Sequence, residues 1–170
     1  MSLAVVFSHG QESGPWGTKI RALADVARYR QMTVTSVDYR GMADPGERVT
    51  RLIEVCGRID APLLLVGSSM GGHVATAAAA TVKPAAIFAM APAYHVPGFE
   101  ALTPDPPPCP LTIVHGWRDD VVPLAGVLQF AEAARAETHI IDSDHRLSDS
   151  VATLKVLFER CLDQTLRSLA

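Results

Sequence analysis

The chain has 170 residues, 48% of them hydrophobic, which is enough for one domain, residues 1–170, to fold around its own apolar core. The formal net charge is −3 and the Lys and Arg residues are scattered, so we expect no nucleic-acid partner. The three cysteines have no paired spacing, which predicts free thiols. We expect a soluble cytoplasmic protein, because no leader precedes the first apolar run and no apolar run is long enough to span a membrane.

Six short apolar runs alternate along the chain with segments of helical length. The predicted strands are Leu3–Phe7, Thr33–Asp38, Pro62–Val66, Ala85–Ala89, Leu111–Val114 and Thr138–Ile141. Strands that are apolar throughout, rather than at alternate positions, are typical of a parallel sheet covered on both faces. We therefore expect an α/β fold of the doubly wound type, with right-handed crossovers through helices.

Between the predicted strands, apolar residues recur with the i, i+3, i+4, i+7 spacing of helices that pack on a sheet. Asp44-Pro45-x-Glu47 has the composition of a capped helix start. Ala77 to Ala80 indicate a helix that packs closely on the sheet. The predicted buried stripes are Ile20, Leu23, Ala24 and Ala27; Val49, Leu52, Ile53 and Cys56; Leu124, Val127, Leu128 and Ala131; and Val151, Leu154, Phe158, Cys161 and Leu162.

The pentad Gly67-Ser68-Ser69-Met70-Gly71 lies between the third predicted strand and the alanine-rich helix. A strand, a sharp turn and a helix in this order expose a serine hydroxyl, and the flanking glycines allow the tight turn. Ser69 is the candidate nucleophile because it alone is centred between the two glycines. Ser68 is its nearest rival, and an ordinary glycine-rich turn is the simpler interpretation.

A serine nucleophile needs a base and a group that orients the base. Asp119 follows the fifth predicted strand and is the candidate acid, with Asp120 as the alternative. His145 follows the last predicted strand and is the candidate base. Asp142 and Asp144 are closer to it in sequence, but we expect them to shape the loop or cap the next helix.

Three segments, Gly67–Gly72, His115–Pro123 and His145, resemble the catalytic segments of the α/β-hydrolase superfamily, and Val5–Gly10 is similar to its His-Gly loop. The resemblance implies a small serine hydrolase without a lid, with a six-stranded, mainly parallel sheet in the order 2-1-3-4-5-6. It also implies an oxyanion hole formed by the backbone N–H groups of Gln11 and Met70.

The remaining histidines are expected to have other roles. His9 and His115 each precede a glycine at a strand end and are interpreted as structural. His73 is expected to lie on a surface that packs inward, and His139 belongs to the last predicted strand. His95 remains a possible substrate contact. No set of His, Cys, Asp and Glu has the spacing of metal ligands, so we expect neither a metal nor a cofactor.

The segment Pro92–Pro110 contains seven of the twelve prolines and is expected to form a stiff wall rather than a lid. Tyr94 and Phe99 in it could line an acyl pocket or could simply cover the core. Arg40 could meet an anionic substrate group, although a structural turn is the favoured interpretation. Glu12, beside Gln11, departs from the small or apolar residues often found there in the superfamily.

The resulting hypothesis is acyl transfer from a small-molecule ester or thioester to water through Ser69, Asp119 and His145. A non-catalytic binding protein that keeps the fold is an alternative from a different class, because a fold does not prove a function. An acyltransferase or peptidase using the same residues is a further alternative. The acyl chain, the leaving group and the oligomeric state are not predicted.

Overall fold

The computed structural model of the protein describes residues 2–170, which contain a six-stranded sheet. The strand order is β2-β1-β3-β4-β5-β6, and every neighbouring pair is parallel. The predicted order is confirmed, and each predicted strand lies within two residues of an observed one. The strands are β1 (Ala4–Ser8), β2 (Thr33–Val37), β3 (Leu63–Ser68), β4 (Ala86–Met90), β5 (Leu111–Gly116) and β6 (Glu137–Ile141).

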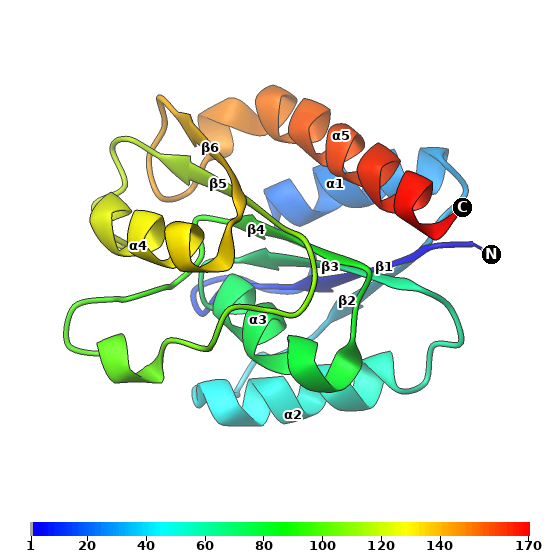
Figure 1. Cartoon of the computed structure of the whole chain (residues 1–170), viewed down its shortest axis with the longest axis horizontal. Coiled ribbons are helices and arrows are strands. Elements are labelled where there is room, and N and C mark those ends of the chain that lie inside the picture. Colours follow the sequence, from blue (N-terminus) through cyan, green and yellow to red (C-terminus); the bar gives the residue numbers. More distant parts are fainter. Residues whose placement is uncertain (1) are drawn as a thin grey trace.

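Five helices of more than one turn cover the two faces of the sheet within the described residues. They are α1 (Thr18–Tyr29), α2 (Pro45–Cys56), α3 (Met70–Val82), α4 (Leu124–Ala134) and α5 (Val151–Leu169). Helices α1 and α5 pack on one face, and α2, α3 and α4 pack on the other (Figure 1). No helix within residues 2–170 has both the length and the apolar character needed to cross a lipid bilayer.

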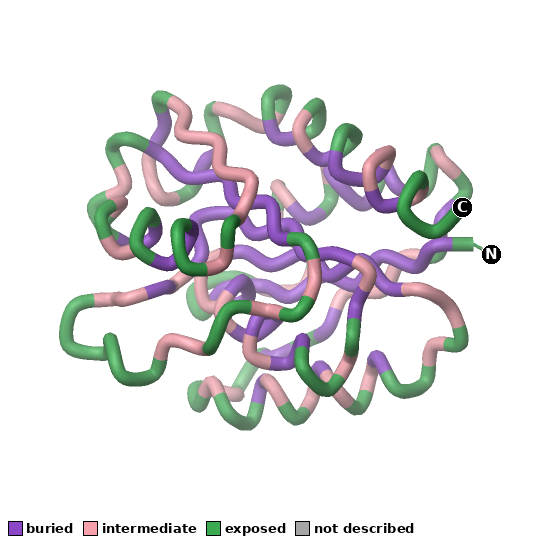
Figure 2. The backbone as a smooth tube through the Cα atoms, in the orientation of Figure 1, coloured by how far each residue is buried: buried purple, intermediate pink, exposed green. Residues whose placement is uncertain are grey.

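The two covered faces explain why the strands are apolar at every position. Val5 and Phe7 of β1 belong to the core under α1 and α5, whereas Ala4 and Val6 belong to the core on the opposite face. Buried backbone accordingly runs through the central strands, while the outer sides of the helices are exposed (Figure 2).

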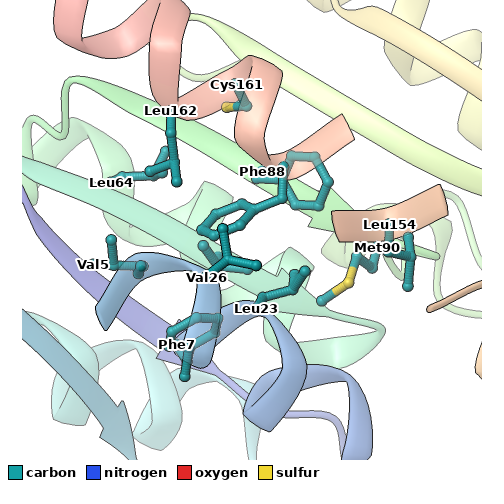
Figure 3. Packing of buried hydrophobic residues seen from close by; sticks show 14 of the residues in the cluster. Val5, Phe7, Leu23, Val26, Leu64, Phe88, Met90, Leu154, Cys161 and Leu162 are labelled. Atoms are coloured by element: carbon teal, nitrogen blue, oxygen red, sulfur yellow. The ribbon is translucent and has the colours of Figure 1, made fainter. Parts of the chain in front are cut away.

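Side chains from α1 and α5 meet those of the central strands in the first core (Figure 3). Leu23 comes from α1, Leu154 and Leu162 from α5, and Phe88 from β4. The rings of Phe88 and Phe158 make an edge contact with centroids 5.4 Å apart.

Two helix predictions had different outcomes. The start of α2 is confirmed, since Asp44 accepts a hydrogen bond from the backbone N–H of Glu47 and Pro45 is the first helical residue. The buried stripe predicted for α4 is wrong at Leu128, which is 44% exposed. Helix α4 contacts the sheet through the narrower strip of Val127, Phe130 and Ala131.

Candidate active site

Ser69 lies between the last residue of β3 and the first residue of α3, with φ 53° and ψ −118°. Residues other than glycine rarely adopt this conformation, so the surroundings must hold it. The Ser69 N–H donates to the carbonyl of Met90 at 2.9 Å. Its own carbonyl accepts hydrogen bonds from the N–H groups of Gly72, His73 and Ala93. The turn is therefore fixed from both sides, as expected for a serine presented at a sharp strand-to-helix turn.

The two glycines around Ser69 are required by close contacts between backbones. A Cβ on Gly71 would lie 1.9 Å from the carbonyl oxygen of Ser8, because α3 begins directly against β1. A Cβ on Gly67 would lie 2.5 Å from the carbonyl oxygen of Gly71. No real side chain can occupy either position without moving the backbone.

The structure brings Ser69, His145 and Asp119 into one hydrogen-bonded line. Nε2 of His145 lies 3.0 Å from Oγ of Ser69, although 76 residues separate the two in sequence. Nδ1 of His145 lies 2.7 Å from Oδ2 of Asp119. Because an ionised Asp119 can only accept, Nδ1–H is the donor in this contact, and Nε2 is left to accept from the Ser69 hydroxyl.

The Asp119 carboxylate is fully buried, and the backbone supports its charged form. Burial would raise its pKa, but hydrogen bonds from His145 and from the N–H groups of Val122 and Val121 outweigh that effect and hold the pKa below its usual value. The two backbone contacts, both to Oδ1, are 2.7 Å and 2.9 Å long. Oδ2 is therefore left to hold the imidazole.

His115 lies beneath this loop and is fully buried. Its Nε2–H donates to the carbonyl of Val122 at 2.9 Å and lies 3.4 Å from Oδ2 of Asp119. Burial lowers the pKa of His115, which favours the neutral ring. His115 thus fixes the loop that carries Asp119, in agreement with the structural role expected for it.

The alternative candidates do not take part in the hydrogen-bonded line of Ser69, His145 and Asp119. Ser68 reaches the cavity but makes no hydrogen bond to His145 within residues 2–170, and Asp120 is exposed. The carboxylate of Asp142 pairs with Arg118 at 2.8 Å. Asp144 accepts hydrogen bonds from the N–H groups at the start of the following turn, so it shapes the loop as expected.

A cavity of about 920 Å³ lies over Ser69 and His145. Gln11 and Met70 both line it, and neither backbone N–H donates to another described residue. One wall is apolar and contains Val96, Phe99, Leu102 and Val121, of which Phe99 is 63% exposed. The cavity therefore offers two free backbone donors and an apolar surface next to the Ser69 hydroxyl.

Of the predicted substrate contacts, Phe99 lies in the cavity wall, while Tyr94, His95 and Arg40 lie outside it. Tyr94 is fully buried, and its hydroxyl donates to Thr76 at 2.5 Å. It is a core residue because its ring stacks on Phe130 with centroids 3.9 Å apart. Arg40 is engaged by the neighbouring carboxylate of Asp38 at 2.6 Å.

His95 belongs to the same core edge, since its ring faces Phe130 and its N–H donates to the hydroxyl of Thr103. His9 is fully buried and accepts the N–H of Tyr39 on Nε2, so that Nδ1–H donates to the carbonyl of Gly10. Among the described residues there is no group of three His, Cys, Asp or Glu side chains that could hold a metal ion.

Sequence reasoning missed two cationic residues that line the cavity, Lys19 and Arg146. Lys19 lies in the first turn of α1, next to Ile20 of the predicted buried stripe. Arg146 directly follows His145, and this adjacency was the available signal. For Lys19, helix periodicity alone could not show that the start of α1 faces the carboxyl edge of β3.

Comparisons with known proteins agree with this architecture. Residues 5–166 match the profile of the alpha/beta hydrolase family, so the chain belongs to that family. A protein from Xanthomonas campestris pv. campestris, whose name places it among hydrolases of the alpha/beta superfamily, is 30% identical. The match covers 96% of this chain and 99% of that one, with a TM-score of 0.86.

Two further solved structures share the fold. Alpha/beta hydrolase domain-containing protein 10 from mouse is 18% identical over 95% of this chain and 90% of that one, with a TM-score of 0.81. A second Xanthomonas campestris protein, described as a serine hydrolase without a lid, is 19% identical over 95% of this chain and 81% of its own, with a TM-score of 0.77. No curated protein matches the chain in sequence.

Proposed function

We propose that the protein is a serine hydrolase that cleaves small esters or thioesters through an acyl-enzyme intermediate. The observation that carries this proposal is the continuous line from the Ser69 hydroxyl through the His145 ring to the Asp119 carboxylate. A serine hydroxyl is a weak nucleophile near neutral pH, and a base in this position removes that limit. Family membership and the lidless neighbour support the same class.

In the first half-reaction, Oγ of Ser69 attacks the carbonyl carbon while Nε2 of His145 takes the hydroxyl proton. Asp119 stabilises the imidazolium that forms and keeps Nδ1 protonated. The imidazolium then gives its Nε2 proton to the leaving alcohol or thiol. Water attacks the acyl-serine by the same route, with His145 again accepting a proton and returning it to Ser69.

The N–H groups of Gln11 and Met70 would bind the oxyanion of each tetrahedral intermediate. Both residues line the cavity beside Ser69, and both donors are free to bind a ligand. Donors of this kind typically stabilise the transition state by about 3–4 kcal/mol each. The N–H of Met70 is also the first of α3, where the helix dipole favours negative charge.

The cavity favours small acyl groups with good leaving groups. Its apolar wall of Val96, Phe99 and Leu102 suits a short acyl chain, and the site is open enough for water to reach the acyl-serine. An open site excludes water poorly, which favours esters and thioesters over amides. The free thiols of the three cysteines fit a reducing compartment such as the cytoplasm.

A chain-length series of p-nitrophenyl esters, run beside acyl-CoA substrates, tests this function. We expect turnover that is highest for short chains, is lost in Ser69→Ala and is retained in Ser68→Ala, the matched control one residue away. Equal activity of wild type and Ser69→Ala would refute the nucleophile. No turnover of any substrate by the wild type would favour the non-catalytic binding protein instead.

A further inference from the structure

The cavity over Ser69 is lined by apolar and by cationic side chains that come from different segments of the chain. The loop after β4 supplies apolar side chains, including Val96, Phe99 and Leu102. The start of α1 and the loop after β6 supply Lys19 and Arg146. A substrate whose acyl chain contacts the apolar side chains would meet positive charge at the cationic ones.

Lys19 is partly buried, and within residues 2–170 its ammonium group makes no hydrogen bond or ion pair. Burial lowers the pKa of Lys19 to about 8, although the nearby carboxylates of Asp144 and Asp119 oppose this shift. The side chain is therefore mostly protonated at neutral pH, and burial removes part of the solvation of its charge. A partly buried cation of this kind gains more from an anionic ligand than an exposed lysine does.

The backbone around Lys19 also favours an anion. Helix α1 begins after Gly17 with no side-chain cap and no acidic residue in its first turn. Its first residues, Thr18 to Ile20, line the same cavity. The free N–H groups and the positive end of the helix dipole add to the charge of Lys19.

The charge balance of the cavity differs from that of the whole protein. Among its lining residues, Lys19 and Arg146 are cationic and Glu12 is the one carboxylate. The carboxylates of Asp119 and Asp144 lie outside the lining but act on Lys19. The complete chain carries a formal net charge of −3. An anionic group would therefore be attracted locally, by these two cations, and not by the charge of the protein as a whole.

We propose that Lys19, Arg146 and the start of α1 form a subsite for an anionic group, a carboxylate or a phosphate, on the leaving group of the substrate. This inference rests on the proposed hydrolase function. The leaving atom must lie next to Nε2 of His145 to receive its proton. Arg146 directly follows His145 in the chain, and both residues line the cavity together with Lys19, so we assign the two cations to the leaving-group side of Ser69.

Matched esters test the subsite. One substrate is the acetate ester of a nitrophenol that carries a free carboxylate on its ring. Its neutral partner is the same acetate ester with the ring carboxylate masked as a methyl ester. We expect wild type to prefer the anionic ester by about tenfold in kcat/KM, which corresponds to about 1.4 kcal/mol, because a hydrogen bond to a charged group is stronger than one to a neutral group. Mono-p-nitrophenyl succinate, which carries its charge on the acyl side, should show no such preference over p-nitrophenyl butyrate.

Variants assign the preference to residues. Lys19→Met should reduce the anionic-to-neutral ratio to near one, and Lys19→Arg should restore most of it. Arg21→Gln is the matched control, because Arg21 lies on the same helix but is exposed and outside the cavity. An unchanged ratio in Lys19→Met, or an equal loss on both esters, would overturn the subsite.

Competing ligands identify the anion. The two inhibitors are p-nitrophenyl phosphate and the carboxylate-bearing nitrophenol that the anionic ester releases. Each should inhibit hydrolysis of the neutral ester, more strongly in wild type than in Lys19→Met. The stronger inhibitor indicates whether the site suits a carboxylate or a phosphate, and inhibition by neither contradicts the proposal. Turnover of the neutral ester without any preference would retain the hydrolase and reject the subsite, whereas no turnover at all would reject the hydrolase itself.

Discussion

At the scale of single residues, the conformation of Ser69 is the feature on which the site depends. A non-glycine residue in such a region costs about 1–3 kcal/mol, which the rest of the fold must supply. Four backbone hydrogen bonds, from both peptide groups of Ser69, hold it in place. The strained backbone belongs to the residue whose hydroxyl lies next to His145, and this coincidence favours a role for that hydroxyl beyond packing.

Replacing Asp119 tests the proposed orientation of the base. In Asp119→Asn the side-chain oxygen can still accept from the Val121 and Val122 N–H groups, so the loop should keep its shape. The amide cannot stabilise an imidazolium, and we expect kcat to fall by ~10³–10⁴. Steady-state hydrolysis of p-nitrophenyl acetate measures this loss. Asp120→Asn is the control, and its kcat should stay within about twofold of wild type. A larger loss in Asp120→Asn than in Asp119→Asn would mean that Asp120, and not Asp119, orients the base.

The residues that the fold brings together at the candidate site were largely predictable from the sequence, because few residue types can act as nucleophile, base and orienting acid. Ser69, Asp119 and His145 each follow a strand, and parallel strands bring their carboxyl ends to one edge. Tyr94 was ambiguous because an aromatic residue in a proline-rich loop can face either a cavity or the core, and its partner Phe130 is distant in sequence. Lys19 carries no motif at all, so only the arrangement in space reveals it.

At the scale of secondary-structure elements, the junction of β3 and α3 decides the geometry. Helix α3 starts so close to β1 that only glycine fits at position 71. The same approach places the first N–H groups of α3 beside the loop that follows β1, where Gln11 lies. Close packing and the proposed oxyanion hole therefore have one structural cause.

Gly71→Ala should consequently destabilise the protein. A Cβ placed 1.9 Å from the Ser8 carbonyl forces α3 away from β1, and we expect the free energy of unfolding to fall by at least about 3 kcal/mol. Urea denaturation followed by circular dichroism measures it. Gly14→Ala is the control, because its Cβ would make an ordinary contact, 3.8 Å from Arg40, and should change stability by less than about 0.5 kcal/mol. Equal stability of the two variants would contradict this explanation.

Strands were predictable at this scale because β1, β3 and β4 are apolar on both faces. The buried faces of the helices were harder to predict. Leu128 satisfies the helical spacing, yet it is exposed because α4 covers one end of the sheet and buries a narrower strip. Periodicity gives the direction of a stripe but not the width of the surface that it meets.

At the scale of the whole molecule, buried histidines link stability to pH. His9 and His115 are fully buried, and burial lowers the pKa of each below its usual value. The unfolded chain binds these protons near pH ~6.5, whereas the folded protein resists binding them until the pH is lower. Folding stability is therefore complete above that pH and is lost progressively as the pH falls below it.

We therefore expect acid to weaken the fold before most carboxylates titrate. Each such histidine contributes at most about 1.4 kcal/mol per pH unit, so the free energy of unfolding should be lower at pH ~5.5 than at pH ~7.5. Urea denaturation at the two pH values measures the change. In His115→Asn the pH dependence should be weaker. A stability that is constant or higher at the lower pH would show that the buried rings are not held neutral.

The most direct test of the central claim is the site at which a fluorophosphonate probe attaches. The probe reacts covalently with a serine that is activated by a neighbouring base. Peptide mass spectrometry of the labelled wild type should place the adduct on Ser69, with little labelling of His145→Ala and none of Ser69→Ala. An adduct on another residue, or labelling that persists in Ser69→Ala, would contradict the account.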